Sequence, residues 1–141
     1  MIAVDTNILV YAHREELPRH RVARTRLTKL AEGEALWGIP VFCVTEFVRV
    51  VTHPRLFNPP YGADEACRAV DRLLQSPSLR VLHPGSTFLA HFAEALREAD
   101  AVGNLVFDAQ IVAVCRESGV TSLLTQDRDF ARFHRFATQA L

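Results

Sequence analysis

Four carboxylates lie inside or directly after stretches of the chain that are otherwise apolar: Asp5, Glu46, Asp108 and Asp127. An ionised carboxylate that leaves water is costly unless it is paired or bound to a metal. Ligation by oxygen alone favours Mg²⁺ or Mn²⁺ over zinc. Such a site can activate water and stabilise negative charge on a phosphate. We therefore expect these four side chains to form one acidic site that hydrolyses phosphodiester bonds.

Each acid also has a purely structural explanation. Asp5 fits the role of a helix N-cap, Glu46 has Arg49 three positions later as a salt-bridge partner, and Asp127 resembles a turn residue. Asp108 is harder to explain, because no basic residue lies within one helical turn and aspartate is a poor helix former. Because packed carboxylates raise one another's pKa, the four together favour a bound divalent cation.

The elements that must position these acids follow from the hydrophobic pattern, in which short apolar runs alternate with longer helical periodicities. Strands are expected at 2–5, 36–39, 79–82 and 121–124, with a fifth at 133–137. Helices are expected at 6–12, 18–32, 40–52, 64–75, 86–99 and 104–118, with a short helix near Arg128. We therefore predict an α/β fold, a three-layer α/β/α sandwich around a mostly parallel sheet of four or five strands. The length of 141 residues predicts one domain, 1–141.

Ligands of open α/β sheets bind outside the carboxyl ends of the strands. Asp5 ends the first expected strand, and Asp127 lies just past the end of the fourth. Glu46 and Asp108 would reach the same edge from adjacent helices. In the helix at 18–32, residues including Val22 and Leu27 are expected to face the core.

The composition is that of an ordinary globular protein, with 49% hydrophobic and 23% charged residues. A net charge of zero argues against a non-specific nucleic-acid coat, although an acidic site can offset a basic surface. The three cysteines are far apart and indicate neither a zinc site nor a disulfide framework. No apolar run approaches the ~20 residues of a membrane span, and the N-terminus lacks the features of a signal peptide. We therefore expect a cytoplasmic protein that does not enter a membrane.

The acidic motifs together resemble those of the PIN-domain nucleases, specifically the VapC-type toxins of bacterial toxin–antitoxin pairs. The matching segments are Val-Asp-Thr-Asn at 4–7, Thr-Glu-Phe-Val-Arg at 45–49, Gly-Asn at 103–104 with Asp-Ala at 108–109, and Leu-Thr-Gln-Asp-Arg-Asp-Phe at 124–130. Each motif is weak alone, but the order and spacing of the set fit over essentially the whole chain.

The resemblance implies a PIN-like sandwich and a Mg²⁺- or Mn²⁺-dependent endoribonuclease that hydrolyses RNA with metal-activated water. The residues at its catalytic and metal-binding positions are Asp5, Glu46, Asp108 and Asp127. Polar neighbours expected to orient the acids or contact the substrate are Thr6, Asn7, Arg49, Asn104, Thr125 and Asp129. The implied partners are an RNA substrate and a cognate antitoxin protein, in a homodimer or a toxin–antitoxin hetero-oligomer.

One alternative is a catalytically silent PIN-like module that binds RNA or protein, although no acidic position is missing. A phosphohydrolase of the haloacid-dehalogenase type would have a second aspartate where this chain has Asn7. A receiver domain would need a lysine late in the chain, whose only lysine is Lys29. A basic side chain is also expected to position the phosphate, and the possible ones are Arg14, Arg49 and Arg128.

Overall fold

Five parallel strands form one central sheet in the computed structural model, which describes residues 1–141. The strands are β1 (Ile2–Val4), β2 (Trp37–Pro40), β3 (Leu79–Leu82), β4 (Ser122–Leu124) and β5 (Thr138–Gln139), in the spatial order β3-β2-β1-β4-β5. All four strand pairs are parallel. Because β1 lies between β2 and β4, the strand order reverses at β1, and such a reversal is where open α/β sheets bind ligands.

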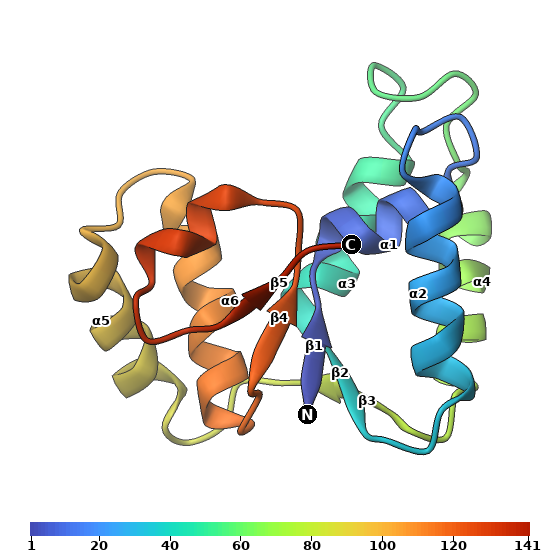
Figure 1. Cartoon of the computed structure of the whole chain (residues 1–141). Helices are drawn as coiled ribbons and strands as arrows, with labels where there is room; N and C mark the ends of the chain where they lie inside the picture. The colour runs from blue at the N-terminus through green and yellow to red at the C-terminus, as the bar shows by residue number, and fades with distance from the viewer.

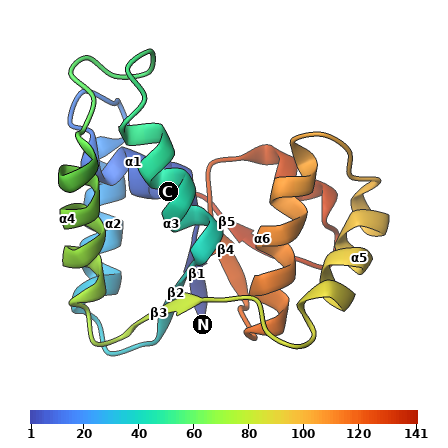
Figure 2. The ribbon, with the colours of Figure 1, turned by 180° about the vertical axis from the view of Figure 1, so that it is seen from behind.

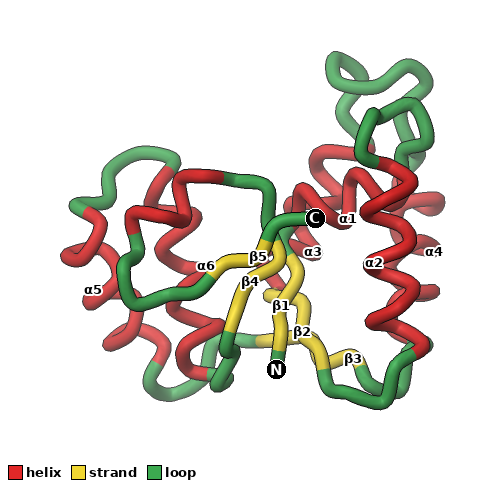
Figure 3. Tube along the Cα trace, viewed as in Figure 1, coloured by secondary structure: helices red, strands yellow, loops and turns green.

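Helices cover both sides of this sheet. They are α1 (Thr6–His13), α2 (His20–Glu32), α3 (Val41–Val51), α4 (Ala63–Leu74), α5 (Phe88–Ala99), α6 (Leu105–Glu117) and the short 3₁₀ helix η1 (Arg128–Arg132). Figures 1 and 2 show α1, α2 and α4 to one side of the strands, and α5 and α6 to the other. Figure 3 shows the strands as a thin layer between these two groups. The expected α/β/α sandwich is confirmed, with a sheet that is parallel throughout.

Helices cover both faces of the sheet, and a strand that is buried on both faces carries no polar side. All four residues of β2 are buried, including Trp37. Gly38 permits the close approach of the neighbouring strand β3, because a Cβ at this position would lie 2.9 Å from a methyl carbon of Leu82. The buried apolar residues of all layers join in one cluster.

Two details of the sequence prediction were wrong. The fifth strand lies at 138–139 rather than 133–137, because Phe133 is buried 6.2 Å from the ring of Phe130 and the backbone there forms turns. Val22 is exposed, because Ala23 and Leu27 set the buried stripe of α2 and Val22 lies one residue off it. The other elements begin and end within two residues of their expected bounds.

No helix of this chain has both the length and the apolar character needed to span a membrane.

Candidate active site

Asp5 is the first residue after β1 and the N-cap of α1, where its carboxylate accepts a hydrogen bond from the Thr6 backbone N–H at 2.7 Å. Its other oxygen accepts from the Asn7 side-chain amide and from the Thr125 hydroxyl, each at 2.6 Å. Only 4% of the residue is exposed. The N-cap explanation is therefore correct, but the three donors also fix the direction of the carboxylate.

Burial is the largest influence on the Asp5 carboxyl and raises its pKa from 3.8 to about 6. The hydrogen bonds from Thr125 and Thr6 lower this pKa, and the nearby charge of Glu46 raises it. Asp5 is thus a buried acid whose negative charge is only partly compensated by the chain.

Thr125 joins the first acidic motif to the last. Besides donating to Asp5, its hydroxyl oxygen accepts from the Asn7 amide at 3.1 Å and from the Asp127 backbone N–H at 3.0 Å. The Asn7 carbonyl oxygen accepts from the Gln126 backbone N–H at 3.1 Å. These bonds connect the start of α1 to the segment after β4, so that Asp5 and Asp127 have a fixed relative position.

Glu46 lies in α3 and directs one carboxylate oxygen to the Thr6 hydroxyl, which donates to it at 2.9 Å. The other oxygen accepts from Arg49 at 3.1 Å. The salt bridge considered as a structural explanation is therefore present, but its arginine is largely exposed. Glu46 remains directed toward the same site as Asp5, through the shared contact with Thr6.

Asp108 lies in the first turn of α6, which begins just after Gly103 in the left-handed region at φ 58°. Aspartate is a poor helix former in general, but placement in the first turn brings this carboxylate close to the positive end of the helix. Asp108 makes no hydrogen bond or salt bridge. Burial raises its pKa from 3.8 to about 7, and the charges of four neighbouring acids add to this effect: Asp127, Asp5, Asp129 and Glu46.

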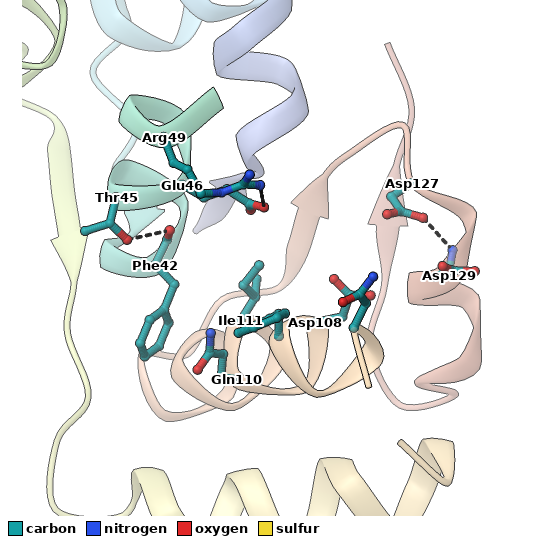
Figure 4. A pocket seen from close by; sticks show the side chains of 11 residues that line it. Phe42, Thr45, Glu46, Arg49, Asp108, Gln110, Ile111, Asp127 and Asp129 are labelled. Atoms are coloured by element: carbon teal, nitrogen blue, oxygen red, sulfur yellow. Dashed lines mark hydrogen bonds and ion pairs between the residues drawn. The ribbon is translucent and has the colours of Figure 1, made fainter. Parts of the chain in front are cut away.

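Asp127 is the N-cap of η1 and accepts a hydrogen bond from the Asp129 backbone N–H at 2.8 Å. The carboxylates of Asp108, Asp127 and Asp129 offer oxygen atoms that lie within 4.8 Å of one another. Figure 4 shows Asp108 on its helix facing Asp127 and Asp129, with Glu46 on a separate helix. Asp129, expected only in a supporting role, therefore belongs to this group of three carboxylates.

Two adjoining cavities contain the acids. The smaller, of about 300 Å³, is lined by all four acids expected from the sequence, together with Thr6 and Asn7. The larger, of about 820 Å³, is lined by 11 residues, namely Phe42, Thr45, Glu46, Arg49, Asn104, Phe107, Asp108, Gln110, Ile111, Asp127 and Asp129. Glu46, Asp108 and Asp127 line both cavities, so the two volumes belong to one site.

The donor set of this site suits a hard divalent cation. Its carboxylate oxygens are the ligands that Mg²⁺ and Mn²⁺ prefer. Arg49 is the only basic residue that lines either cavity, so the acids outnumber the available positive charge. The raised pKa values of Asp5 and Asp108 reflect the same excess of buried negative charge. A cation bound at this position would neutralise part of that negative charge.

Two further side chains, Cys43 and Arg14, are buried. The Cys43 thiol lies 3.7 Å from an Asp5 carboxylate oxygen. Its position three residues before Glu46 on one helix is the signal that could have placed it there. Arg14 is buried under the 53–62 loop, where it pairs with Glu16 at 2.6 Å and lies over the Phe57 ring. Arg14 is therefore not available to a substrate phosphate.

The fold and the acidic site define a PIN-type domain, and the PIN domain family model matches residues 2–135. The chain belongs to the PIN-domain family, and its resemblance to the VapC-type members is confirmed by curated relatives. It is 40% identical to ribonuclease VapC43 of Mycobacterium tuberculosis over 135 residues, which cover 96% of this chain and 91% of the relative. It is 34% identical to ribonuclease VapC31 of the same species, with coverage of 94% and 93%.

Solved structures support the fold. VapBC2 from Rickettsia felis, crystallised with a DNA fragment from its promoter, aligns with a TM-score of 0.72 at 19% identity and covers 99% of this chain and 98% of that one. Mycobacterium tuberculosis VapC20, described as a toxin that cleaves the sarcin-ricin loop, aligns with a TM-score of 0.67 at 22% identity and covers 93% of each chain.

Proposed function

We propose that this protein is a metal-dependent endoribonuclease and the toxin of a toxin–antitoxin pair. The observation that carries the proposal is that four acids line one cavity, and they come from the N-cap of α1, from α3, from α6 and from the segment after β4. The ribonuclease names of the relatives at 40% and 34% identity support RNA as the substrate. Hydrolysis at a metal-binding carboxylate cluster uses water as the nucleophile, so no nucleophilic side chain is required.

The cation proposed for this site is Mg²⁺ or Mn²⁺, and the residues that would hold it are Asp5, Glu46, Asp108 and Asp127, with Asp129 at their edge. A divalent cation bound there would lower the pKa of a water molecule and neutralise charge on the scissile phosphate. Thr6 and Asn7 contribute by orienting the acids, as does Thr125. Such contacts behind the ligands fix the geometry of a metal site.

Arg49 is the side chain best placed to bind a substrate phosphate. It lines the larger cavity, and its guanidinium can form charge-assisted hydrogen bonds with phosphate oxygens. Its present partner is Glu46, but an exposed ion pair contributes little and can be exchanged for a substrate contact. Asn104 lines the same cavity and would contact the RNA from the start of α6.

We also propose that residues 1–141 act as one domain, and that a cognate antitoxin protein binds it in the cytoplasm. A homodimer or a toxin–antitoxin hetero-oligomer would be the assembled form. The kinship with the VapC-type family supports this part of the proposal.

The test is cleavage of a mixed RNA pool by purified protein with Mg²⁺ or Mn²⁺, beside EDTA. The variant Asp108→Asn removes an acid that makes no hydrogen bond, and Asp71→Asn removes an exposed acid of α4 as a matched control. We expect cleavage by the parent and by Asp71→Asn only with the cation, and none by Asp108→Asn. Equal cleavage by all three proteins, or cleavage that survives EDTA, would contradict the proposed mechanism. Binding of RNA without cleavage by the parent would favour the catalytically silent module instead.

A further inference from the structure

Phe107 is an exposed aromatic residue at the acidic site. It lines the larger cavity and 60% of it is exposed, although the adjacent Asp108 belongs to the acid cluster. Six other large hydrophobic residues are exposed, but none of them is aromatic and none lines either acidic cavity. Single exposed apolar residues are ordinary on protein surfaces. The position of Phe107 inside a polar, acidic cavity is what distinguishes it.

The Phe107 ring is also unengaged. The other aromatic residue of the cavity, Phe42, packs 5.9 Å from Phe88, which in turn stacks on Phe92 at 5.7 Å. Phe42 is therefore part of a ladder of rings that joins α3 to α5. Phe107 has no such ring partner, so its face is available to a ligand.

Two amides flank this ring on the same helix. Asn104 and Gln110 lie three residues before and after Phe107, which places the three side chains along successive turns. All three line the larger cavity, and neither side-chain amide makes a hydrogen bond within the chain. An aromatic face between free amide donors and acceptors matches the way in which proteins bind unpaired RNA bases.

The charge of the site favours a contact with a base over further contacts with phosphate. Nucleic-acid affinity usually comes from lysine and arginine, but Arg49 is the only basic residue lining the cavity, and the whole chain has no net charge. Stacking of a base on an aromatic ring is independent of charge and contributes substantially to the binding of single strands.

We propose that Phe107 is the stacking platform for one nucleobase of a single-stranded RNA, with Asn104 and Gln110 at the edges of that base. This inference rests on the proposed ribonuclease function and names how its substrate is held. Phe107 is a positioning residue: the stacked base would hold its own phosphodiester beside the carboxylates of Asp108 and Asp127.

The test compares the binding of two probes in the presence of Ca²⁺: a fluorescent single-stranded RNA octamer of random sequence and an abasic ribose-phosphate octamer of equal charge. We expect the parent to bind the base-bearing probe about tenfold more tightly than the abasic probe. Phe107→Ala should lose this preference, whereas Leu89→Ala, which removes a side chain 74% exposed on α5, should keep it.

Phe107→Trp provides a gain-of-signal control. It should keep the preference, and its indole fluorescence should be quenched by the base-bearing octamer only, because the chain's single native tryptophan, Trp37, is fully buried. A preference retained by Phe107→Ala, or absent from the parent, would overturn the inference. A Phe107→Ala protein whose assembly mass in sedimentation differs from that of the parent would also overturn the inference, because the ring would then be a contact between copies of the chain.

The two proposals fail separately. A parent that prefers the base-bearing octamer but never cleaves RNA with Mg²⁺ or Mn²⁺ retains the platform and lacks the ribonuclease function. A parent that cleaves RNA but binds both octamers equally is a ribonuclease in which Phe107 has no stacking role.

Discussion

Replacing Asp108 by asparagine should stabilise the metal-free protein while abolishing its activity. Asp108 makes no hydrogen bond, and the charges of Asp127, Asp5, Asp129 and Glu46 all act against its ionisation. An amide of the same size removes this repulsion without removing a structural contact. The substitution should therefore raise the free energy of unfolding. Replacing an aspartate with a purely structural role would lower it.

The magnitude follows from the pKa of Asp108, which is 3.8 ordinarily and about 7 in the folded protein. The folded state binds the proton more tightly, so the free energy of unfolding falls as the pH rises from about 4 to about 7. The full difference corresponds to about 4 kcal/mol. Asp108 is only half-buried, so solvent screening reduces the effect, and we expect Asp108→Asn to gain roughly 1 to 2 kcal/mol at pH 8.

Urea denaturation in EDTA at pH 5 and pH 8 measures this gain, with Asp71→Asn as the control for loss of one exposed negative charge. At pH 5 most of the repulsion is absent because Asp108 in the folded parent is protonated, so the gain should shrink. Added Mg²⁺ should stabilise the parent at pH 8 and leave Asp108→Asn unchanged. An Asp108→Asn protein that is less stable than the parent at pH 8 would show that the Asp108 charge is not destabilising.

Four further predictions test the rest of the site and its support. Thr125→Val should lower the free energy of unfolding by about 1 to 3 kcal/mol, because buried Asp5 loses a donor and the Asp127 N–H loses its acceptor; unchanged urea midpoints would count against the hydrogen-bond network. Arg49→Gln should change stability by less than about 0.5 kcal/mol, since its ion pair is exposed, yet reduce kcat/KM for RNA at least about tenfold; equal kinetics would remove Arg49 from the substrate site. Binding of Mg²⁺ at pH 6.5 should release protons, because Asp5 and Asp108, with pKa values of about 6 and about 7, must ionise; calorimetric enthalpies that do not depend on the buffer would show otherwise. Arg116→Met should cost about 3 to 5 kcal/mol in thermal or urea unfolding, because it leaves Glu98 without its partner at 2.6 Å between α5 and α6; a stability loss below 1 kcal/mol would show that the pair is not a structural connection.

The positions of the acids could be predicted because each one breaks an apolar pattern. Asp5 ends a buried strand, and the carboxyl ends of parallel strands meet at one edge, so an acid there was expected to face a ligand site. Glu46 and Asp108 lie on predicted helices next to that edge, from which their side chains were expected to reach the same site. The structure places these three acids with Asp127 around one cavity.

The contacts around the acids could not be predicted in the same way, because they depend on side chains distant in sequence. The bonds between Asn7, Thr125 and Asp5 join residues about 120 positions apart. Similarly, nothing in the sequence near Arg14 shows that Phe57 and Tyr61 fold back over its guanidinium. The 133–137 segment was predicted as a strand, but its backbone forms turns and its apolar residue Phe133 is buried there.

The metal site can be located directly by the anomalous diffraction of Mn²⁺ in crystals of the parent protein, grown without competing chelators. We expect a Mn²⁺ peak between the carboxylates of Asp5, Asp108 and Asp127, and no peak there in Asp108→Asn crystals. A parent protein that cleaves RNA with Mn²⁺ but binds the ion away from these carboxylates would show that the four acids are not the metal site.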